Sequence, residues 1–428
     1  MKRVLIIAYY WPPAGGPGVQ RWLKFVTYFR EFGIEPIVYT PENPHYPLID
    51  ENIINEVPEG IEIIKFPIKE PYRFAQLFSK KKTKQISSGI ITKKQPSIVE
   101  RVMLWIRGNY FIPDARIGWV KPSVKYLKEY IKQNNIDAII TTGPPHSMHL
   151  IGLELKRKLS ITWIADFRDP WTTIHYHKSL QLSDSSEKKH KQLEKEVLQN
   201  ADCVVVTSPN TKIEFKEVTD QPIEVITNGY DTNHIVTNDL DEKFTLVHIG
   251  SLLSGRNPEV LWKVLSELCL KNESFANDFK LKLIGAVSNE VIDSLKKHQL
   301  VENTEVVGYV SHQEALQYQH NAQMLLLIEM DTAETRSIIP GKLFEYLLAK
   351  RPIVALGPEG SDIEAIISET NSGRFFNYND ELQLKKEIAF SYQLYSEGKL
   401  NVVSNGIEKY SRRELTLKMA ETIKRTLM

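Results

Sequence analysis

The sequence predicts an α/β protein made of two doubly wound, Rossmann-like domains that face a cleft. Short apolar runs alternate with amphipathic segments along most of the chain, and the pattern starts again after the turn dipeptide Asn228-Gly229. The chain has 428 residues, enough for two or three domains, and its 42% hydrophobic and 25% charged residues are typical of soluble globular proteins. The predicted domains are residues 1–227 and 244–405, joined by a linker at 228–243.

Apolar runs predict the strands of the first domain, and helical periodicity predicts the segments between them. The expected strands are residues 4–8, 36–39, 61–66, 136–141, 161–165 and 203–207, and the expected helices are residues 19–32, 124–134, 147–159 and 187–199. The first helix carries Trp22, Phe25 and Phe29 on one face, and Gly33 ends it. Strands that are apolar throughout and alternate with helices indicate a parallel sheet covered on both faces.

The second domain repeats this alternation. Its expected strands are residues 244–249, 279–284, 305–307, 324–328 and 352–356, and its expected helices are residues 259–270, 289–299, 312–320, 342–349 and 381–395. A last amphipathic segment lies within residues 406–428. We expect this segment to form a helix that crosses back onto the first domain.

Charge and cysteine content exclude several classes of protein. Lys plus Arg is 54 and Asp plus Glu is 53, a net charge of +1, whereas a general nucleic-acid binder is strongly basic. The two cysteines, Cys203 and Cys269, are too few for a disulfide framework and fit a reducing compartment. No run reaches the ~18 apolar residues of a membrane helix. We therefore expect a cytoplasmic protein, with any membrane contact peripheral and on the inner face.

One stretch, residues 71–122, interrupts the alternation. Between Arg73 and Arg107 it has nine basic residues and one acid, Glu100, a local balance of +8. Bulky apolar residues such as Phe78 and Trp105 lie among the charges. Basic and apolar residues mixed in this way suit an anionic membrane surface or a lipid-linked acceptor. A solvated insertion is the plain structural alternative, and nucleic acid is disfavoured because the rest of the chain lacks a basic stripe.

A glycine-rich loop follows the first predicted strand. Gly15 and Gly16 lie between that strand and the next helix, where a ligand can approach the backbone closely. The helix that follows offers unpaired N–H groups and a partial positive charge to a phosphate. The loop is not Gly-x-Gly-x-x-Gly, so it does not predict dinucleotide binding. A sharp turn between strand and helix is the structural alternative.

The segment from Pro340 to Glu345 predicts a second phosphate site. Pro340 suits the first position of a helix, which would leave the N–H groups of Gly341, Lys342 and Leu343 unpaired and able to bind phosphate. Glu345 lies one turn further along on the face of Gly341. Its carboxylate can accept hydrogen bonds from two adjacent hydroxyls, as on a ribose, although it could also be a simple exposed helix acid.

Charged residues also follow predicted strands elsewhere. Asp166, Arg168 and Asp169 come after the strand at 161–165, where parallel sheets bind ligands, although a structural Asp–Arg pair is the alternative. His146 follows the strand at 136–141, and the spacing of its neighbouring histidines matches no standard zinc pattern, so we expect no metal site. Arg256 follows the strand at 244–249 and can neutralise a diphosphate across an interdomain cleft, unless it is a surface arginine in a turn.

Taken together, these motifs resemble the GT-B glycosyltransferases of the retaining family four, of bacterial polysaccharide type. The resemblance rests on the order and spacing of five segments, at residues 9–16, 166–171, 226–231, 250–256 and 341–355. By this resemblance Gly15 and Gly16 match the glycine loop near the donor diphosphate, and Arg256 matches the basic residue that contacts it. Glu345 matches the second glutamate of the Glu-x7-Glu motif. Ser337 replaces the first glutamate, and Arg168-Asp169 stands where a histidine is usual.

The resemblance implies a retaining transfer of a hexosyl or related group in cell-surface polysaccharide synthesis. The donor would be a UDP- or GDP-linked sugar, and the acceptor a glycan or a lipid-linked sugar. We expect Asp169, His146 and Arg168 to be the catalytic residues, with neither a metal nor another cofactor. A nucleotide-sugar 2-epimerase of the same fold and a non-catalytic nucleotide-sugar-binding scaffold are the alternatives.

Overall fold

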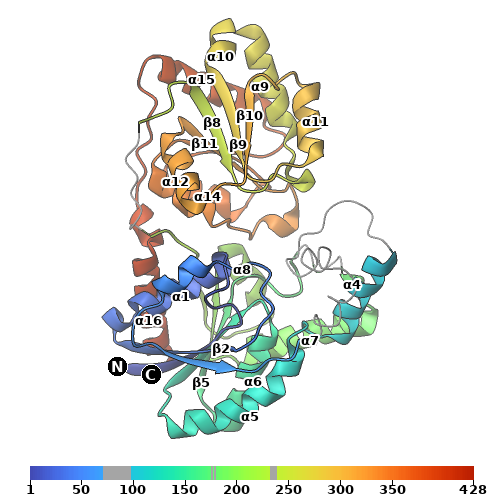
Figure 1. The fold of residues 1–428 in the computed structure, drawn as a ribbon, viewed down its shortest axis with the longest axis vertical. Coiled ribbons are helices and arrows are strands. Elements are labelled where there is room, and N and C mark those ends of the chain that lie inside the picture. The colour runs from blue at the N-terminus through green and yellow to red at the C-terminus, as the bar shows by residue number, and fades with distance from the viewer. Residues whose placement is uncertain (71–97, 175–176, 178–179, 232–238) are drawn as a thin grey trace. The chain divides into compact units, whose positions relative to one another are not determined.

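The computed structural model describes residues 1–70, 98–174, 177, 180–231 and 239–428. The chain forms two compact units, one of Met1–Asn228 with Arg412–Met428 and one of Gly229–Ser411 (Figure 1). Residues 71–97 of the predicted basic insertion lie outside the described residues. Among the helices that are described, none combines the length and the apolar character needed to cross a bilayer.

The first unit is built on a seven-stranded parallel sheet of order β3-β2-β1-β4-β5-β6-β7. The strands are β1 (Lys2–Ile7), β2 (Ile34–Pro41), β3 (Glu62–Phe66), β4 (Ala138–Gly143), β5 (Thr162–Phe167), β6 (Cys203–Val206) and β7 (Ile223–Val225). In the register of the sheet, Ile7 at the end of β1 lies beside Tyr39 of β2 and Thr141 of β4. The carboxyl ends of these three strands therefore meet at one edge.

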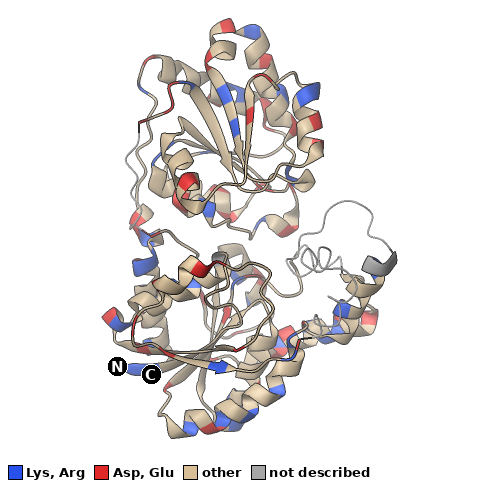
Figure 2. Cartoon of the chain, in the orientation of Figure 1, with Lys and Arg blue, Asp and Glu red and all other residues tan. Residues whose placement is uncertain are grey.

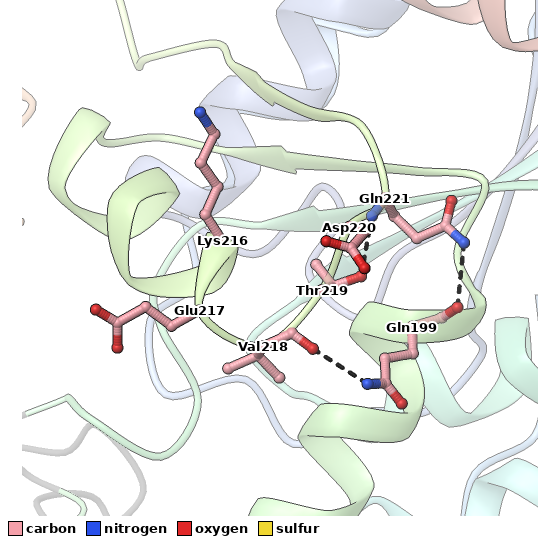
Figure 3. Close-up of a pocket in the computed structure, with 7 residues that line it drawn as sticks. All are labelled: Gln199, Lys216, Glu217, Val218, Thr219, Asp220 and Gln221. Atoms are coloured by element: carbon pink, nitrogen blue, oxygen red, sulfur yellow. Dashed lines mark hydrogen bonds between the residues drawn. The ribbon is translucent and has the colours of Figure 1, made fainter.

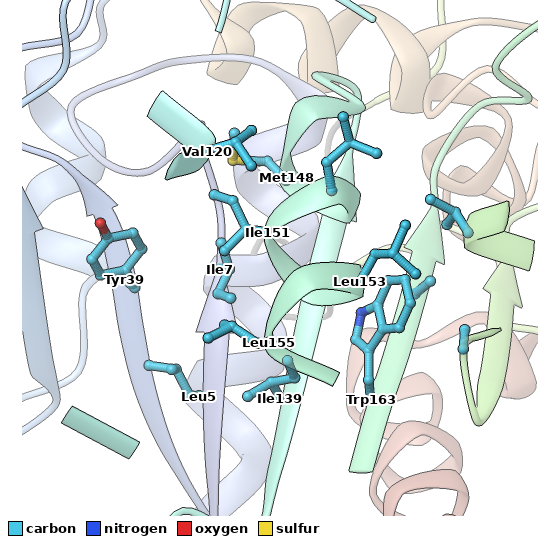
Figure 4. Packing of buried hydrophobic residues seen from close by; sticks show 14 of the residues in the cluster. Leu5, Ile7, Tyr39, Val120, Ile139, Met148, Ile151, Leu153, Leu155 and Trp163 are labelled. Carbon is cyan, nitrogen blue, oxygen red and sulfur yellow. The ribbon is translucent and has the colours of Figure 1, made fainter. Parts of the chain in front are cut away.

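Helices cover both faces of the first sheet. On one face lie α1 (Pro17–Phe29) and α16 (Arg412–Thr426), whose apolar residues share a core with alternate residues of the strands. On the other lie α5 (Ile117–Gln133), α6 (Ser147–Leu159) and α7 (Asp184–Asn200), where Ile151 of α6 packs with Ile7 and Ile139 (Figure 4). The unit also contains α4 (Ile98–Tyr110), α8 (Pro209–Lys216) and the short helices η1 (Arg30–Phe32) and η2 (Glu51–Glu56).

The second unit repeats the plan with six parallel strands in the order β10-β9-β8-β11-β12-β13. The strands are β8 (Phe244–Ile249), β9 (Phe279–Ile284), β10 (Thr304–Gly308), β11 (Met324–Ile328), β12 (Ile353–Leu356) and β13 (Gly373–Phe376). One face is covered by α9 (Glu259–Lys271), α10 (Glu273–Asp278), α11 (Asn289–Lys297) and α15 (Glu381–Ser396). The other is covered by α12 (His312–Asn321), α13 (Lys342–Ala349), α14 (Asp362–Thr370) and η7 (Ile407–Tyr410). Two short helices, η5 (Ser254–Arg256) and η6 (Ala333–Thr335), follow β8 and β11.

The chain passes between the units twice, at 228–229 and at 411–412. Near these crossings the Tyr230 N–H donates to the Tyr410 carbonyl at 3.1 Å, and Tyr230 forms a parallel bridge with Ser411. The two crossing segments are therefore paired with each other inside the second unit.

The fold class predicted from the sequence is confirmed, with two doubly wound parallel sheets. Elements that were not expected are the short strands β7 and β13, in which Glu224 and Arg374 interrupt the apolar run, and the helices α4, α8, α10 and α14. Helix α5 starts seven residues before the expected residue 124, with Pro122 inside it. The loss of one backbone hydrogen bond at a proline is offset there by burial of Trp119 and Val120.

Each sheet has one point at which the chain reverses the direction in which it adds strands. This point lies between β1 and β4 in the first unit and between β8 and β11 in the second. Doubly wound sheets bind ligands beyond the carboxyl ends of the strands at this point. Both signs of charge are interspersed over the helices of each unit (Figure 2), so the loops after these strands, rather than a charged face, identify the candidate site.

Candidate functional site

The glycine loop after β1 packs against a neighbouring loop before α1 begins. The Gly15 N–H donates to the Leu48 carbonyl at 3.1 Å, and a Cβ at Gly15 would lie 3.0 Å from the Leu48 side chain. Gly16 is the N-cap of α1, with a φ of 102°. That left-handed backbone conformation favours glycine. Because residues 15 and 16 carry no side chains, the backbone N–H groups at the N-terminus of α1 are not covered by side chains of this loop.

Arg168 lies against this helix terminus. Its guanidinium donates through Nε to the Gly143 carbonyl at 3.2 Å and through Nη2 to the Pro144 carbonyl. A Cβ at Gly18, in the first turn of α1, would clash with Nη1 of Arg168. Burial lowers the pKa of Arg168, and the neighbouring Asp169 opposes this shift. Asp169 is partly buried and follows Arg168 directly.

Asp166 does not pair with Arg168, which the structural alternative had allowed. It is buried, and its carboxylate accepts hydrogen bonds from Arg21 Nη2, Trp22 Nε1 and Thr142 Oγ1, each at 2.8 Å. Burial opposes ionisation of Asp166, but Arg21 and these hydrogen bonds outweigh it and hold the carboxyl pKa below its usual range. Arg21 Nη1 also donates to the Thr227 carbonyl at 2.8 Å. Asp166 thus fixes α1 to the sheet.

His146 occupies the N-cap position of α6, beyond β4. Its ring stacks on Trp171 with centroids 4.9 Å apart and planes at 4°. It is 7% exposed, and neither ring nitrogen has a hydrogen-bond partner within the described parts of the chain. Burial lowers its pKa well below the usual value, assisted by His149 and Arg168. His146 is therefore a buried imidazole that favours its neutral form, and neither of its nitrogens is paired within the described residues.

In the second unit, Arg256 is held by a buried acid that the sequence prediction missed. The guanidinium Nε lies 2.9 Å from Glu329 Oε1, and Nη2 donates to Oε2 at 3.3 Å. Glu329 also accepts from the Met330 N–H at 2.9 Å. Glu329 directly follows the wholly apolar strand β11, the same position in the pattern that identified Asp166. That rule, applied to every strand, would have found it.

Helix α13 covers the expected range 342–349, so it begins two residues after Pro340, which the sequence places at its first position. Gly341 is its N-cap and Lys342 its first residue. The Leu343 N–H donates to the Pro340 carbonyl at 3.0 Å, so the prediction that this N–H is unpaired is wrong. The Leu343 N–H is thus already used by the turn that begins at Pro340. Gly341 remains at the helix terminus, where the positive end of the helix dipole lies.

The Lys342 side chain turns back toward the end of β8. Its Nζ donates to the Ile249 carbonyl at 2.8 Å and lies 3.4 Å from His248 Nε2. Burial, and after it the positive charge of Arg256, lower the pKa of this lysine to about 7, while Glu329 acts in the opposite direction. The structure therefore brings Lys342 and Arg256 into one electrostatic group, which the sequence did not predict.

Glu345 lies one turn along α13. Its Oε2 accepts from Gln319 Nε2 at 2.9 Å, and its Oε1 is 3.8 Å from His312 Nε2. The side chain is 29% exposed. Gln319 and His312 both come from α12, which gave no sequence signal for a role at this site. A carboxylate held by one amide retains acceptor capacity for ligand hydroxyls.

Neither a metal cluster nor the surface pocket competes with these loops. Within the described ranges, no three His, Cys, Asp or Glu residues are grouped so that they could hold a metal ion. A pocket lined by Gln199 and residues 216–221 is partly closed by the hydrogen bonds from Gln199 to Val218 and from Gln221 to Gln199 (Figure 3). It precedes β7 and so lies at the amino edge of the sheet, away from the ligand-binding edge.

Solved structures with this fold are numerous. Sucrose-phosphate synthase of Thermosynechococcus elongatus is similar with a TM-score of 0.60 and 15% identity over 99% of each chain. HepE of Anabaena, solved in complex with UDP-glucose, has a TM-score of 0.62 and 12% identity over 99% of this chain and 100% of that one. A putative UDP-N-acetylglucosamine 2-epimerase of Listeria monocytogenes has a TM-score of 0.53 and 10% identity over 99% and 96%. No curated protein matches the sequence.

These similarities establish the fold, which is GT-B. The family model named Glycosyltransferase Family 4 matches residues 18–234, slightly more than half of the 428-residue chain. The match includes the first turn of α1, His146 and the segment from Asp166 to Trp171. The chain belongs to glycosyltransferase family 4.

Proposed function

We propose that the protein is a retaining glycosyltransferase that moves a hexosyl or related group from a UDP- or GDP-linked sugar. The acceptor is a glycan or a lipid-linked sugar, and the product serves cell-surface polysaccharide synthesis. The observation that carries the proposal is the Arg256–Glu329 pair at the carboxyl edge of the second sheet, with Lys342 beside it. A fixed, partly exposed guanidinium there suits a diphosphate.

Different residues would bind the diphosphate and the ribose of the donor. Arg256 and the N-terminus of α13 at Gly341 would neutralise the diphosphate, while the buried Leu343 supports the helix. Glu345, oriented by Gln319, would accept hydrogen bonds from the two ribose hydroxyls. HepE of Anabaena, which has this fold and was solved with UDP-glucose bound, supports a nucleotide-sugar donor. Gly15 and Gly16 would leave the backbone at the N-terminus of α1 accessible to a phosphate.

Arg168, Asp169 and His146 would act at the sugar. In a retaining transfer the leaving phosphate can take the acceptor proton, so the enzyme has to orient the acceptor and stabilise positive charge at the sugar carbon. Asp169 carries the negative charge that suits the second task. His146 has two ring nitrogens without partners in the described structure, and these can bind sugar hydroxyls. Arg168 adds positive charge at the terminus of α1 for the leaving group.

Positive side chains and helix termini would replace a metal ion at the phosphates. The test is hydrolysis or transfer of UDP- and GDP-sugars by the purified protein, measured as released nucleotide with and without a chelator. We expect turnover that the chelator leaves unchanged. Loss of turnover with chelator and recovery with magnesium or manganese would overturn the phosphate scheme.

The same assay separates the alternatives. A 2-epimerase shares this fold, as the Listeria structure illustrates, and would convert the donor into its C2 epimer without net release of nucleotide. A scaffold would bind nucleotide tightly without turnover. Ser337, in place of the first motif glutamate, is the feature that favours considering a scaffold. Sugar transfer to an added acceptor would exclude both alternatives.

A membrane surface is the proposed location of the acceptor. The segment 73–107 carries its +8 balance mostly outside the described residues. Within them, α4 presents Val102, Trp105, Ile106 and Tyr110, all exposed, with Arg101 in the same helix. Their spacing of three to four residues places Val102, Trp105 and Ile106 on one face. An exposed apolar face with basic neighbours suits the interface of an anionic bilayer.

A further inference from the structure

Lys342 is placed where a cation is poorly stabilised. It is the first residue of α13, so its charge adds to the positive end of the helix dipole. Arg256 lies close enough to act on it electrostatically. The nearest acid, Glu329, is already engaged by Arg256 through both carboxylate oxygens. Two neighbouring cations, Lys342 and Arg256, thus share the one acid that acts on Lys342, Glu329.

The hydrogen bonds around Nζ leave one of its protons unassigned. His248 Nδ1 lies 3.0 Å from the Leu326 carbonyl, which can only accept, so Nδ1 carries the ring proton. Nε2 of this buried histidine is then an acceptor, and Lys342 donates to it and to the Ile249 carbonyl. An ammonium has three protons, and these two contacts use two of them.

The residue beside Nζ is a glycine, Gly250, so no side chain from that position covers the amine. Gly250 has a φ of 107°, and a Cβ there would lie 3.6 Å from Nζ. Lys342 itself remains partly exposed. The groups that face it are His248 on β8, Arg256 on η5 and Glu329 after β11, while Tyr346 on its own helix binds the Ile249 N–H. None of these supplies a free negative charge.

We infer that the Lys342 ammonium is a second cationic ligand of the donor diphosphate, and that it takes up a proton as the diphosphate binds. This inference rests on the proposed function, which supplies the diphosphate. The bound phosphates provide the negative charge that the apo site lacks. The proton moves from solvent to Nζ, and no covalent bond changes.

The lowered pKa of the free enzyme, about 7, sets the range in which uptake is measurable. Above that pH the free lysine is mostly neutral and has to gain a proton on binding. Nucleoside diphosphates are fully ionised there, because the second phosphate pKa is about 6. The apparent dissociation constant should therefore rise close to tenfold from pH 7.5 to pH 8.5, in the linkage limit of one proton.

The experiment measures UDP and GDP binding by titration calorimetry at pH 7.5 and 8.5, in buffers of different ionisation enthalpy. We expect wild type to take up close to one proton at pH 8.5. Lys342→Arg, which is charged at every pH, should bind with a pH-independent affinity and no proton uptake. Lys342→Met should bind more weakly at pH 7.5, while Lys350→Met, at the other end of α13, should behave as wild type.

Three results would overturn the inference. One is binding by wild type with neither proton uptake nor pH dependence, which leaves the proposed function intact. Another is the same pH dependence in wild type and Lys342→Arg, which would assign the proton to a different group. The last is binding of neither nucleotide at pH 7.5, which would remove the proposed function as well. The wild-type measurement needs no variant, so a misfolded variant does not obscure the outcome.

Discussion

Each unit holds a buried acid and an arginine near the carboxyl edge of its sheet, but the two pairs differ in what they expose. The Arg21 and Asp166 side chains are 2% and 0% exposed. Arg256 is 30% exposed over a Glu329 that is 1% exposed. The first pair is enclosed on all sides and fastens α1 to the sheet. The second presents its arginine to solvent, so the same residue types in similar sheets serve structure in one unit and, in the proposed function, would serve binding in the other.

In the first unit, Arg168 lies near the carboxyl edge of the sheet, and its guanidinium is oriented differently from that of Arg256. The carbonyls of Gly143 and Pro144 orient its guanidinium, where Glu329 orients that of Arg256. Carbonyl oxygens orient an arginine without cancelling its charge. The comparison predicts that the first unit depends on its pair for folding and the second for ligand affinity.

Asp166→Ala should break the comparison most visibly. It leaves Arg21 buried without its charge partner, and such losses cost about 3–5 kcal/mol of unfolding free energy. Glu329→Ala should cost less stability, because Arg256 can be hydrated, and should mainly weaken nucleotide binding. Urea denaturation of both variants, with nucleotide titration, checks this. Equal destabilisation by the two substitutions would contradict the distinction between the pairs.

Acid should weaken the first unit more than the second. Burial lowers the pKa of His146 and His149 in the first unit, to about 3 for His149, and that of His248 in the second. A histidine that stays neutral when folded contributes stability above its unfolded pKa of about 6.5, and loses about 2 kcal/mol of it between pH 7 and pH 5. Between pH 7 and pH 5 we therefore expect the unfolding free energy to fall by about 4 kcal/mol in the first unit, from His146 and His149, and by about 2 kcal/mol in the second, from His248.

Hydrogen exchange at pH 7 and pH 5 measures this difference, with the amides of β4 and β11 as reporters. His149→Gln should reduce the acid sensitivity of β4 and leave that of β11 unchanged. An equal loss of protection in both sheets, or a larger one in β11, would show that the buried histidines do not control it.

Glu345→Ala tests the binding role of the second unit. Removal of a carboxylate that accepts from two hydroxyls should weaken nucleotide binding by about 2–4 kcal/mol, from charge-assisted bonds of roughly 1.5–3 kcal/mol each. Glu345→Gln, which keeps one acceptor oxygen and the contact distance to Gln319, should be intermediate. Affinity equal to wild type in a folded Glu345→Ala protein would remove Glu345 from the donor site.

Asp169→Asn tests the first unit at the sugar. The change keeps the shape and removes the charge, so turnover should fall about 10²-fold while donor affinity stays nearly constant. Steady-state kinetics combined with nucleotide titration separates the two quantities. Normal turnover would exclude Asp169 from catalysis, and an unfolded variant would show that it instead holds Arg168 in place.

The last prediction concerns the proposed membrane contact of residues 73–107. Changing Lys80, Lys81, Lys82 and Lys84 to Ser should reduce binding to anionic liposomes, at about 1 kcal/mol for each basic residue that reaches the surface. Trp105→Ser in α4 should also reduce it, whereas Phe390→Ser, an exposed aromatic in the second unit, should not. Cosedimentation at rising salt measures the effect, since screening weakens it. Equal partitioning of all variants would remove the membrane role.

The sequence predicted the sheet elements well because buried parallel strands are apolar throughout. Strands 244–249, 279–284 and 324–328 match the structure, and so do helices α6 and α13. The short strands β7 and β13 were missed because one charged residue in three or four destroys the pattern. The pattern of apolar residues indicates which side chains are buried, and strands of three or four residues bury too few side chains to give a clear pattern.

Only some of the contacts around the candidate site residues could be predicted from the sequence. The positions of the loop glycines, of Arg256 and of Glu345 could be predicted because each follows a strand or lies near the start of a helix. The local sequence indicates such positions. The Lys342 side chain, by contrast, reaches Ile249, 93 residues away, and Gln319 reaches Glu345 from another helix. The Leu343 N–H was mispredicted because the helix starts two residues after Pro340, and such a shift changes which backbone groups are paired. Contacts between distant segments depend on tertiary packing, which no single motif encodes.

The paired crossings at Tyr230 and Tyr410 have a mechanical consequence. A single tether between two bodies acts as a swivel, because its bonds rotate freely. Two passages of chain joined by the Tyr230–Tyr410 hydrogen bond cannot move independently of each other while that bond is intact. The Thr227 carbonyl, held by Arg21, fixes the chain just before the first passage begins at Asn228. The covalent connection between the units is therefore one hydrogen-bonded pair of segments and not two independent linkers.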